Sequence, residues 1–380
     1  MNGAEIVPGV EALIAEIGPV DGPIASALRA VHRHRFVPPV GLAHAPDDTV
    51  RLIDRDADPA DWMAAVYTDT SIVTQLDDGR SAVEDLDGDY TSSASAPSTV
   101  VELLRWLGAE RGQRVLEVGT GTGWTAALLC HLVGAANVTS VEIDPVVAGQ
   151  AAWRLAEAEL RPHLVVGDGA DGCAERAPFD RVHVTCGVRT IPYAWVRQAR
   201  PGAVIVLPYS PGFGTSHGLR LVTTRDGTAY GRFPGFASYM MMRSQRPRPV
   251  RPPRGPEDRR HLTTRVDPRT IAHAPAGADL AVAALTGVAC HGSAEPDEDG
   301  DLYRMWLSDP EEPGSWAVVD WRPDAEEYEV FQVGDRPLWD EVTDAYFRWV
   351  SWGEPGRERF GMTVTADGQR VWLDDPGRPL

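Results

Sequence analysis

The amino-acid sequence predicts an α/β protein with a doubly wound, mostly parallel β-sheet, followed by a smaller α+β domain. Strand-like and helix-like segments alternate between residues 99 and 207, as they do where right-handed crossovers join parallel strands. The first strand-like segment, 115–118, runs into a glycine-rich turn, 119–123, that leads into a helix. Three segments predict the smaller domain: apolar and polar residues alternate as in strands at 316–320 and 328–333, and 338–352 is amphipathic like a helix.

The composition is that of a globular protein and narrows the chemistry. Of the 380 residues, 43% are apolar and 24% are charged, and the formal net charge is −19. All 36 basic residues are arginine, which excludes a lysine Schiff base and the lysine of a P-loop. The acidic balance disfavours nucleic acid as a partner. The four cysteines lack Cys-x-x-Cys spacing and the N-terminus lacks a long apolar segment, so we expect a cytoplasmic protein without a membrane span.

A Pro- and Arg-rich linker, 246–256, divides the chain in our interpretation. Residues 1–245 form the sheet domain, with an N-terminal helix and an acidic, Pro-interrupted surface excursion at 41–91. Residues 257–380 hold 12 Arg against 26 acidic residues and seven of the twelve tryptophans. We expect this acidic domain to select the substrate, although an aromatic core alone explains most of its tryptophans. We expect the protein to be a monomer.

Two elements are predicted before the serine-rich region. Residues 21–36 carry apolar side chains at helical spacing and are followed by Pro38-Pro39, which ends the helix. His32 and His34 lie two residues apart on this helix and face different ways, so we expect no metal site. Residues 65–69 are rich in β-favouring side chains and predict an extended piece.

The serine-rich stretch 91–98 opens an apolar helix, 99–107. A hydroxyl at this place caps a helix by accepting a hydrogen bond from a free backbone N–H group. Capping accounts for one or two hydroxyls, but four precede Pro97. Because a helix N-terminus also favours an anionic ligand, both interpretations stay open at this point.

The glycine-rich turn predicts a nucleotide-type ligand, and two ligands compete. Residues 121–126 satisfy the dinucleotide fingerprint with Ala126 in last place, and Glu142 lies at a suitable distance to hold a ribose. The alternative is an acidic residue followed by three glycines spaced by two, Glu117 to Gly123, which resembles motif I of class I S-adenosylmethionine-dependent methyltransferases. Because a carboxylate at Glu117 suits the cationic amino-acid end of S-adenosylmethionine and repels a pyrophosphate, we favour this Rossmann-like methyltransferase.

Acidic residues follow successive predicted strands, 115–118, 138–143 and 164–166, at the edge of the sheet where ligands bind. Glu142 is placed to accept hydrogen bonds from ribose hydroxyls, and Asp168 to meet an adenine amino group. A fourth strand, 179–185, precedes Cys186-Gly187, and a fifth spans 203–207. The predicted cofactor-binding residues are Glu117, Gly119, Thr120, Gly121, Gly123, Glu142, Ile143, Asp168 and Gly169.

Between residues 20 and 209 the order of these segments resembles the protein-L-isoaspartate O-methyltransferase family. The segments that carry the resemblance are Arg35-Phe36-Val37-Pro38, Tyr67-Thr68-Asp69, Ser95-Ala96-Pro97, 115–124, Gly167-Asp168-Gly169, 179–184, and Arg200-Pro201-Gly202 with Pro208. The resemblance implies that S-adenosyl-L-methionine methylates a carboxylate of a protein or peptide bearing Asp or isoAsp, leaving S-adenosyl-L-homocysteine. It also implies that Ser92, Ser93, Ser95 and Pro97 bind the substrate.

Two departures refine the expectation. The substrate loop, Ser92-Ser93-Ala94-Ser95, is richer in serine than the family's Thr-Ile-Ser, and a long domain follows the catalytic one. Both resemble actinobacterial relatives that methylate an aspartate of a modified, constrained ribosomal peptide, whose ester collapses to a succinimide and can hydrolyse to isoaspartate. The alternatives are a general isoaspartyl repair enzyme and an inactive peptide-binding protein with the same fold.

The mechanism needs no general base, because an acceptor carboxylate is already ionised at neutral pH. The protein's contribution is alignment and the removal of water from that carboxylate. We expect the hydroxyls of Ser93 and Ser95 to act in catalysis by orienting the acceptor, since neutral donors hold a carboxylate without trapping it in an ion pair.

Overall fold

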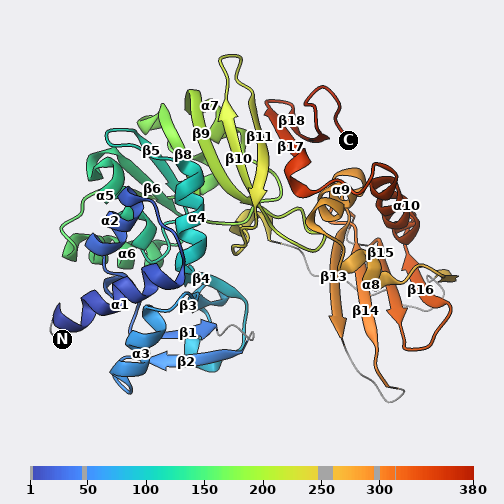
Figure 1. Cartoon of the computed structure of the whole chain (residues 1–380), viewed down its shortest axis with the longest axis horizontal. Helices are drawn as coiled ribbons and strands as arrows, with labels where there is room; N and C mark the ends of the chain where they lie inside the picture. The colour runs from blue at the N-terminus through green and yellow to red at the C-terminus, as the bar shows by residue number, and fades with distance from the viewer. Residues whose placement is uncertain (1–2, 45–48, 247–259, 295–299, 313) are drawn as a thin grey trace. The chain divides into compact units, whose positions relative to one another are not determined.

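The computed structural model describes residues 3–44, 49–246, 260–294, 300–312 and 314–380, which form two compact units (Figure 1). Unit 1 takes in residues up to 187, 192–207 and 220–229, and unit 2 takes in 188–191, 208–219 and the described residues from 230 onward. This division differs from the predicted boundaries at 245 and 257, because strands before 245 pair with the C-terminal hairpin. Apart from Arg246, the predicted linker 246–256 lies outside the described residues.

A nine-stranded sheet contains the strands of the predicted α/β fold, in the order β18-β17-β11-β10-β9-β8-β5-β6-β7. The pairs β9–β8, β8–β5, β5–β6 and β6–β7 are parallel. From β5 the chain passes to β6 and β7 and then returns to β8 on the other side of β5, which places a topological switch point between β5 and β8. These strands are β5 Val115–Val118, β6 Val138–Glu142, β7 His163–Val166, β8 Phe179–Val184, β9 Ala199–Tyr209, β10 His217–Thr223 and β11 Ala229–Gly235.

Helices cover the parallel strands, which explains why β5 is apolar almost throughout and wholly buried. α4 packs on β8, α5 on β5 and β6, α6 on β6 and β7, and α2 on both α4 and α5. The doubly wound, mostly parallel sheet is therefore confirmed. The helices of this part are α1 Gly3–Glu16, α2 Gly22–Ala30, α4 Pro97–Leu107, α5 Trp124–Val133, α6 Pro145–Glu157 and α7 Tyr193–Arg197.

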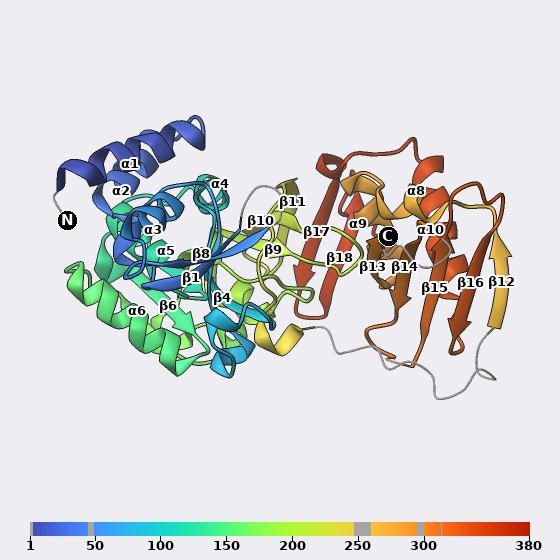
Figure 2. The ribbon, with the colours of Figure 1, turned by 90° about the horizontal axis from the view of Figure 1, so that it is seen from below.

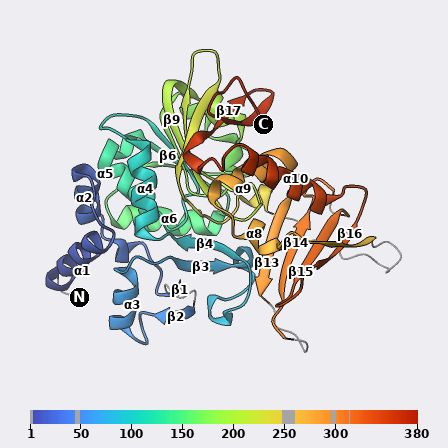
Figure 3. The same cartoon turned by 45° about the vertical axis from the view of Figure 1, so that its right-hand side comes forward.

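A second, four-stranded antiparallel sheet lies where we predicted a surface excursion at 41–91 (Figure 3). Its order is β2-β1-β3-β4, and it buries Leu42, Ile53 and Ile72. Each strand has only five residues, and acidic and proline residues separate them, so no long alternation marks the sheet in the sequence. The strands are β1 Val40–His44, β2 Val50–Asp54, β3 Ile72–Leu76 and β4 Tyr90–Ala94.

Two local predictions in this region are wrong. Residues 65–69 are not extended, because helix α3, Pro59–Val66, includes the first two of them. The N-cap residue Asp58 accepts hydrogen bonds from two backbone N–H groups, and a proline follows it at the first helical position. These two signals for the start of a helix outweigh the β-propensity of residues 65–69. The helix predicted over 21–36 ends at Ala30, and a separate 3₁₀ helix follows at Arg33–Arg35. The indole of Trp124 donates to the carbonyl of Val31 at this break.

Unit 2 contains a five-stranded antiparallel sheet in the order β12-β16-β15-β14-β13, which Figure 2 shows in sequence across the unit. α8 and α10 pack on it, and the core includes Met305, Val319, Val330 and Trp339. The strands predicted at 316–320 and 328–333 and the helix predicted at 338–352 are confirmed. The elements are β12 Arg260–Thr264, α8 Pro268–Ala272, α9 Ala276–Thr286, β13 Ala289–Ala294, β14 Tyr303–Ser308, β15 Trp316–Trp321, β16 Tyr328–Val333, α10 Leu338–Ser351, β17 Phe360–Thr365 and β18 Gly368–Leu373.

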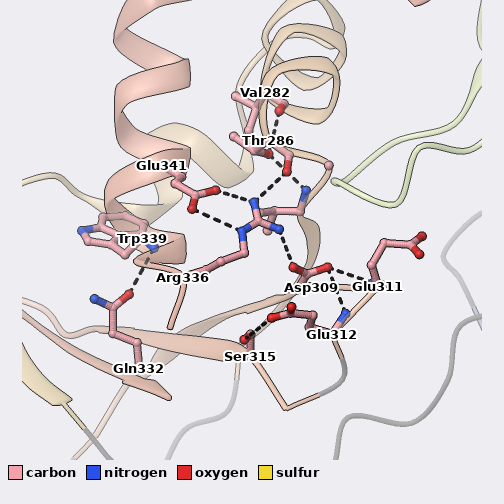
Figure 4. A network of polar contacts seen from close by, with 12 residues as sticks. Val282, Thr286, Asp309, Glu311, Glu312, Ser315, Gln332, Arg336, Trp339 and Glu341 are labelled. Carbon is pink, nitrogen blue, oxygen red and sulfur yellow. Dashed lines mark hydrogen bonds and ion pairs between the residues drawn. The ribbon is translucent and has the colours of Figure 1, made fainter. Parts of the chain in front are cut away.

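One arginine ties together three segments of unit 2 (Figure 4). The guanidinium of Arg336 forms an ion pair of 2.5 Å with Asp309, binds both carboxylate oxygens of Glu341, and donates to the carbonyl of Thr286 at 2.8 Å. These partners lie after β14, at the start of α10 and at the end of α9. Asp309 is buried, and the Arg336 side chain is 29% exposed.

Replacing Arg336 with methionine should lower the free energy of unfolding by about 2–3 kcal/mol, between the values for exposed and buried pairs, because Asp309 keeps its charge without its partner. Urea denaturation of the full chain measures the change. Arg265→Met is the matched control, since the Arg265 side chain is 83% exposed in its pair with Glu327. Equal losses for the two variants would contradict a special role for Arg336.

Candidate active site

The glycine-rich turn between β5 and α5 is held in a conformation that needs glycine. Gly119, Gly121 and Gly123 have φ values of 95°, 53° and 89°. A Cβ atom on Gly119 would lie 2.7 Å from the hydroxyl oxygen of Thr185, which follows β8. A Cβ on Gly121 would lie 3.6 Å from the carbonyl oxygen of Ser93. The turn therefore lies at the switch point and beside the serine-rich strand β4.

Glu142 ends β6 and holds the glycine turn directly. One carboxylate oxygen accepts a hydrogen bond of 2.9 Å from the backbone N–H of Gly121, and the other accepts one of 3.0 Å from that of Asp144. The side chain is 8% exposed, and each of its oxygens has a further lone pair for a ligand. The structure therefore brings Glu142 to the glycine turn, while its contact with a ribose stays a prediction.

Asp168 follows β7 and begins a 3₁₀ helix, Gly169–Asp171, where its carboxylate accepts from the N–H of Ala170. Cys186, after β8, lies within electrostatic reach of both Glu142 and Asp168. Burial and, to a smaller extent, the charges of these two carboxylates together raise the pKa of the Cys186 thiol to about 12. The carboxyl ends of β6, β7 and β8 therefore converge, as the sequence predicted.

Ile143 adds an apolar side chain to this group. It follows Glu142 directly and is 39% exposed, which is unusual for an isoleucine beside a buried strand. Such a surface suits the face of an adenine ring. Gly169 is buried, and its carbonyl accepts a hydrogen bond of 2.8 Å from the indole of Trp195.

Glu117 lies deeper than the other acids and is fully buried. One carboxylate oxygen accepts from the hydroxyl of Ser140, which also bonds the hydroxyl of Thr120 at 2.6 Å, so Thr120 is engaged inside the protein. The other oxygen has no hydrogen-bond partner within the described residues. Burial is the main cause that raises the pKa of Glu117; the Ser140 hydrogen bond opposes it, the charge of Glu142 adds to it, and together they place the pKa at about 8.

The raised pKa of Glu117 predicts the direction in which stability changes with pH. Between pH 4.5 and 8 the folded chain keeps a proton on Glu117 that the unfolded chain has lost, so Glu117 makes stability fall as pH rises. The slope is at most about 1.4 kcal/mol per pH unit for one proton. Urea denaturation across this range should show the slope reduced in Glu117→Gln. Identical pH profiles for variant and parent would contradict the shift.

The serines occupy two different environments. Ser92 is buried in β4, where its hydroxyl accepts a hydrogen bond of 3.2 Å from Thr74, and its contact with a substrate stays a prediction. Ser93 points to the other face of β4, because successive strand residues alternate. The hydroxyls of Ser93 and Ser95 make no hydrogen bond within the described residues, and both side chains are half-buried. Pro97 is buried at the first position of α4.

The capping interpretation of the serines is wrong. The backbone N–H of Ser98 at the start of α4 donates instead to the carboxylate of Asp69, at 2.8 Å. In the sequence, Asp69 was indicated only because Tyr67-Thr68-Asp69 is one of the segments that resemble the methyltransferase family. Two further residues, Arg33 and Thr185, touch the serine strand or the glycine turn and carried no signal in the sequence.

In the described ranges, no group of three or more His, Cys, Asp or Glu side chains is arranged to hold a metal ion. None of the helices in those ranges has the length and apolar character needed to cross a membrane.

Comparison with known proteins agrees with this geometry. The family model described as protein-L-isoaspartate(D-aspartate) O-methyltransferase matches residues 53–231. A protein-L-isoaspartate O-methyltransferase of Opitutus terrae is 36% identical over 203 residues, which are 50% of this chain and 86% of the relative. One from Thermococcus onnurineus is 38% identical over 136 residues, 35% of this chain, and this match spans only 61% of the relative.

A solved structure named protein-L-isoaspartate O-methyltransferase aligns with 97% of this chain and 99% of its own, with a TM-score of 0.55 and 20% sequence identity. At that identity the likeness concerns the fold. It extends over the C-terminal region as well as the methyltransferase sheet.

Proposed function

This chain belongs to the protein-L-isoaspartate O-methyltransferase family, and from that premise we propose that it methylates a side-chain carboxylate of a protein or peptide with S-adenosylmethionine. The observation that carries the proposal is the approach of the Ser93 main chain to Gly121, which brings the segment that bears the unpartnered hydroxyls of Ser93 and Ser95 beside the glycine turn. A carboxylate acceptor needs neutral donors of this kind next to the methyl donor.

The residues present fit S-adenosylmethionine, which supplies an electrophilic methyl group on a sulfonium. Glu142 has free lone pairs for ribose hydroxyls, and Ile143 offers an exposed apolar face for adenine. The unpartnered oxygen of buried Glu117 suits the cationic amino-acid end. A pyrophosphate fits poorly, because the carboxylates of Glu142 and Asp168 both lie near Cys186 and no lysine exists in the chain.

The chain's own residues orient the acceptor and need no proton transfer. Ser93 and Ser95 donate hydrogen bonds to one carboxylate oxygen and leave the other to form the new C–O bond. As the ester forms, the acceptor loses its negative charge, so a site that removes water from the carboxylate favours the reaction. On the released peptide, the next backbone nitrogen attacks the ester carbonyl, closes a succinimide and expels methanol.

For the acceptor we propose an isoaspartyl residue of a protein or peptide. The C-terminal region was one reason to expect a constrained ribosomal peptide instead, and that reason weakens because a solved isoaspartate methyltransferase shares the region. The serine-rich loop remains in favour of the constrained peptide, since Ser93 and Ser95 both keep unpartnered hydroxyls. The constrained-peptide function is therefore the second candidate.

Cofactor binding distinguishes an S-adenosylmethionine-dependent enzyme from a dinucleotide-dependent one. S-adenosylhomocysteine at 100 times its Kd should stabilise the full chain by about 2.7 kcal/mol, and NAD should not. Stabilisation by NAD alone would overturn the proposal in favour of a dinucleotide enzyme.

Methyl transfer to matched peptides then identifies the acceptor. We would compare Asp and isoAsp versions of one peptide, each linear and cyclised, by mass spectrometry for gain of a methyl ester and later loss of methanol. Turnover of the linear isoAsp peptide supports the isoaspartyl function, and turnover of the cyclic Asp peptide alone supports the second candidate. S-adenosylhomocysteine binding without turnover of any peptide supports an inactive binding protein. Deleting 257–380 is a poor test, because it removes β17, the neighbour of β11.

A further inference from the structure

Arg33 is an arginine in the interior of unit 1, only 1% exposed. Within the described residues its guanidinium has no carboxylate as a hydrogen-bond partner. It donates to five backbone carbonyl oxygens: those of Val66 at 2.9 Å, Thr68 at 3.3 Å, Thr70 at 2.8 Å, Ala94 at 3.1 Å and Ser95 at 2.9 Å.

These acceptors belong to two segments that are far apart in the sequence. Three lie at the last residue of α3 and in the turn that follows it, and two lie where β4 leads into the Ser95-Ala96-Pro97 loop. The same guanidinium carbon lies 5.3 Å from the ring centroid of Trp124, the first residue of the helix after the glycine turn. The Trp124 indole donates in turn to Val31, two residues before Arg33. One side chain thus connects the serine loop, the 66–70 turn and the glycine-turn helix.

Burying a guanidinium is costly unless its donors are satisfied, and here backbone carbonyls accept from both terminal nitrogens, whereas Nε has no hydrogen-bond partner within the described residues. Burial lowers the pKa of Arg33 to about 10 and the nearby charge of Asp69 opposes this, so the group is charged at neutral pH. A lysine has the same charge but only three donors on one atom, and cannot bridge carbonyls on both segments in a planar fork.

The second fixed end of the loop is Asp69, which caps α4 through the N–H of Ser98. Asp69 lies in the same turn whose carbonyls Arg33 binds. The segment 93–98, which we call the serine loop, is therefore held by Arg33 at the carbonyls of Ala94 and Ser95 and by Asp69 at the N–H of Ser98. Neither contact involves a serine hydroxyl.

We propose that Arg33 is a positioning residue for methyl transfer: by binding the carbonyls of Ala94 and Ser95 it sets the serine hydroxyls against the glycine turn. This inference rests on the proposed carboxyl methyltransferase function. In this proposal, the position of the serine loop depends on Arg33, whereas cofactor binding depends on Glu142 and the glycines.

The test compares Arg33→Lys with Arg181→Lys in the full chain. Arg181 also donates to backbone carbonyls, those of Leu107 at 2.9 Å and Gly108 at 3.1 Å, but at the opposite end of α4. Both variants should lose thermal stability. Arg33→Lys should lower kcat/KM for the methylated peptide by about 10-fold, a part of the roughly 100-fold that a 1 Å misplacement can cost, with little change in the Kd of S-adenosylhomocysteine. Arg181→Lys should leave kcat/KM within about twofold of the parent.

Amide hydrogen exchange gives a readout that does not require activity. Residues 92–98 should exchange faster in Arg33→Lys than in the parent, while residues 115–124 should not. If the parent methylates none of the peptides, the proposed function fails and exchange still decides the positioning role. Unchanged exchange at 92–98, an unchanged kcat/KM, or a cofactor affinity that falls in step with kcat/KM would overturn the inference.

If Arg33→Lys fails to fold, Asp69→Ala tests whether the same loop must be held in place, and the Asp69 side chain is only half-buried. It removes the cap on Ser98 and should again lower kcat/KM more than cofactor affinity. Parent-like turnover together with parent-like exchange at 92–98 in this variant would equally overturn the inference.

Discussion

Removing the hydroxyl of Ser95 should lower kcat/KM for methyl transfer by up to about 100-fold, the cost of a misplaced reacting group. The structure shows why the effect should be confined to the acceptor. The Ser95 hydroxyl caps no helix, because Asp69 does so, and it holds no backbone group within the described residues. Its loss in Ser95→Ala should therefore leave the fold and the Kd of S-adenosylhomocysteine nearly unchanged.

Ser95→Thr is the matched control, since it keeps a hydroxyl and should retain most of the activity. Steady-state kinetics with a methyl-labelled donor and calorimetry with the product cofactor measure the two quantities separately. A Ser95→Ala variant with full turnover would remove Ser95 from the reaction. A variant that loses the cofactor together with its turnover would make Ser95 a structural residue.

Replacing Glu142 with alanine should weaken cofactor binding by about 1–3 kcal/mol, the usual loss for a charge-assisted hydrogen bond. Because Glu142 also accepts from Gly121 and Asp144, part of that loss will come from the glycine turn itself. Glu142→Gln keeps one acceptor oxygen for the Gly121 N–H group and should lose less affinity. Calorimetry that finds the same affinity in Glu142→Ala as in the parent would place the ribose elsewhere.

The parallel sheet and its ligand edge could be predicted because their signals are local. An apolar strand, a run of glycines and an Ala-rich helix follow one another without interruption at 115–132, and such an order has few alternatives. The rule that ligands bind at the carboxyl ends of parallel strands then predicts Glu142 and Asp168 at one edge of the sheet, and the structure has them at the carboxyl ends of β6 and β7.

What the sequence concealed depends on contacts between distant residues. Arg33 looked like one more polar position on a helix, and only the fold brings it to the carbonyls of residues 66–70 and 94–95. The same holds for Asp69, whose cap partner is 29 residues further along. The sheet at 40–94 was missed because each of its strands is too short to show a period.

The hairpin that completes the nine-stranded sheet is synthesised after the other strands of that sheet. β11 ends at Gly235 and its neighbour β17 begins at Phe360, so 124 residues lie between the two partners. At a synthesis rate of about 5–20 residues per second, a ribosome leaves β11 as an unpaired edge for roughly 6–25 s. Arg232 and Pro234 lie within β11, and such residues discourage pairing with a foreign strand. Until β17 is synthesised, these two residues therefore oppose the pairing of the open edge of β11 with another chain.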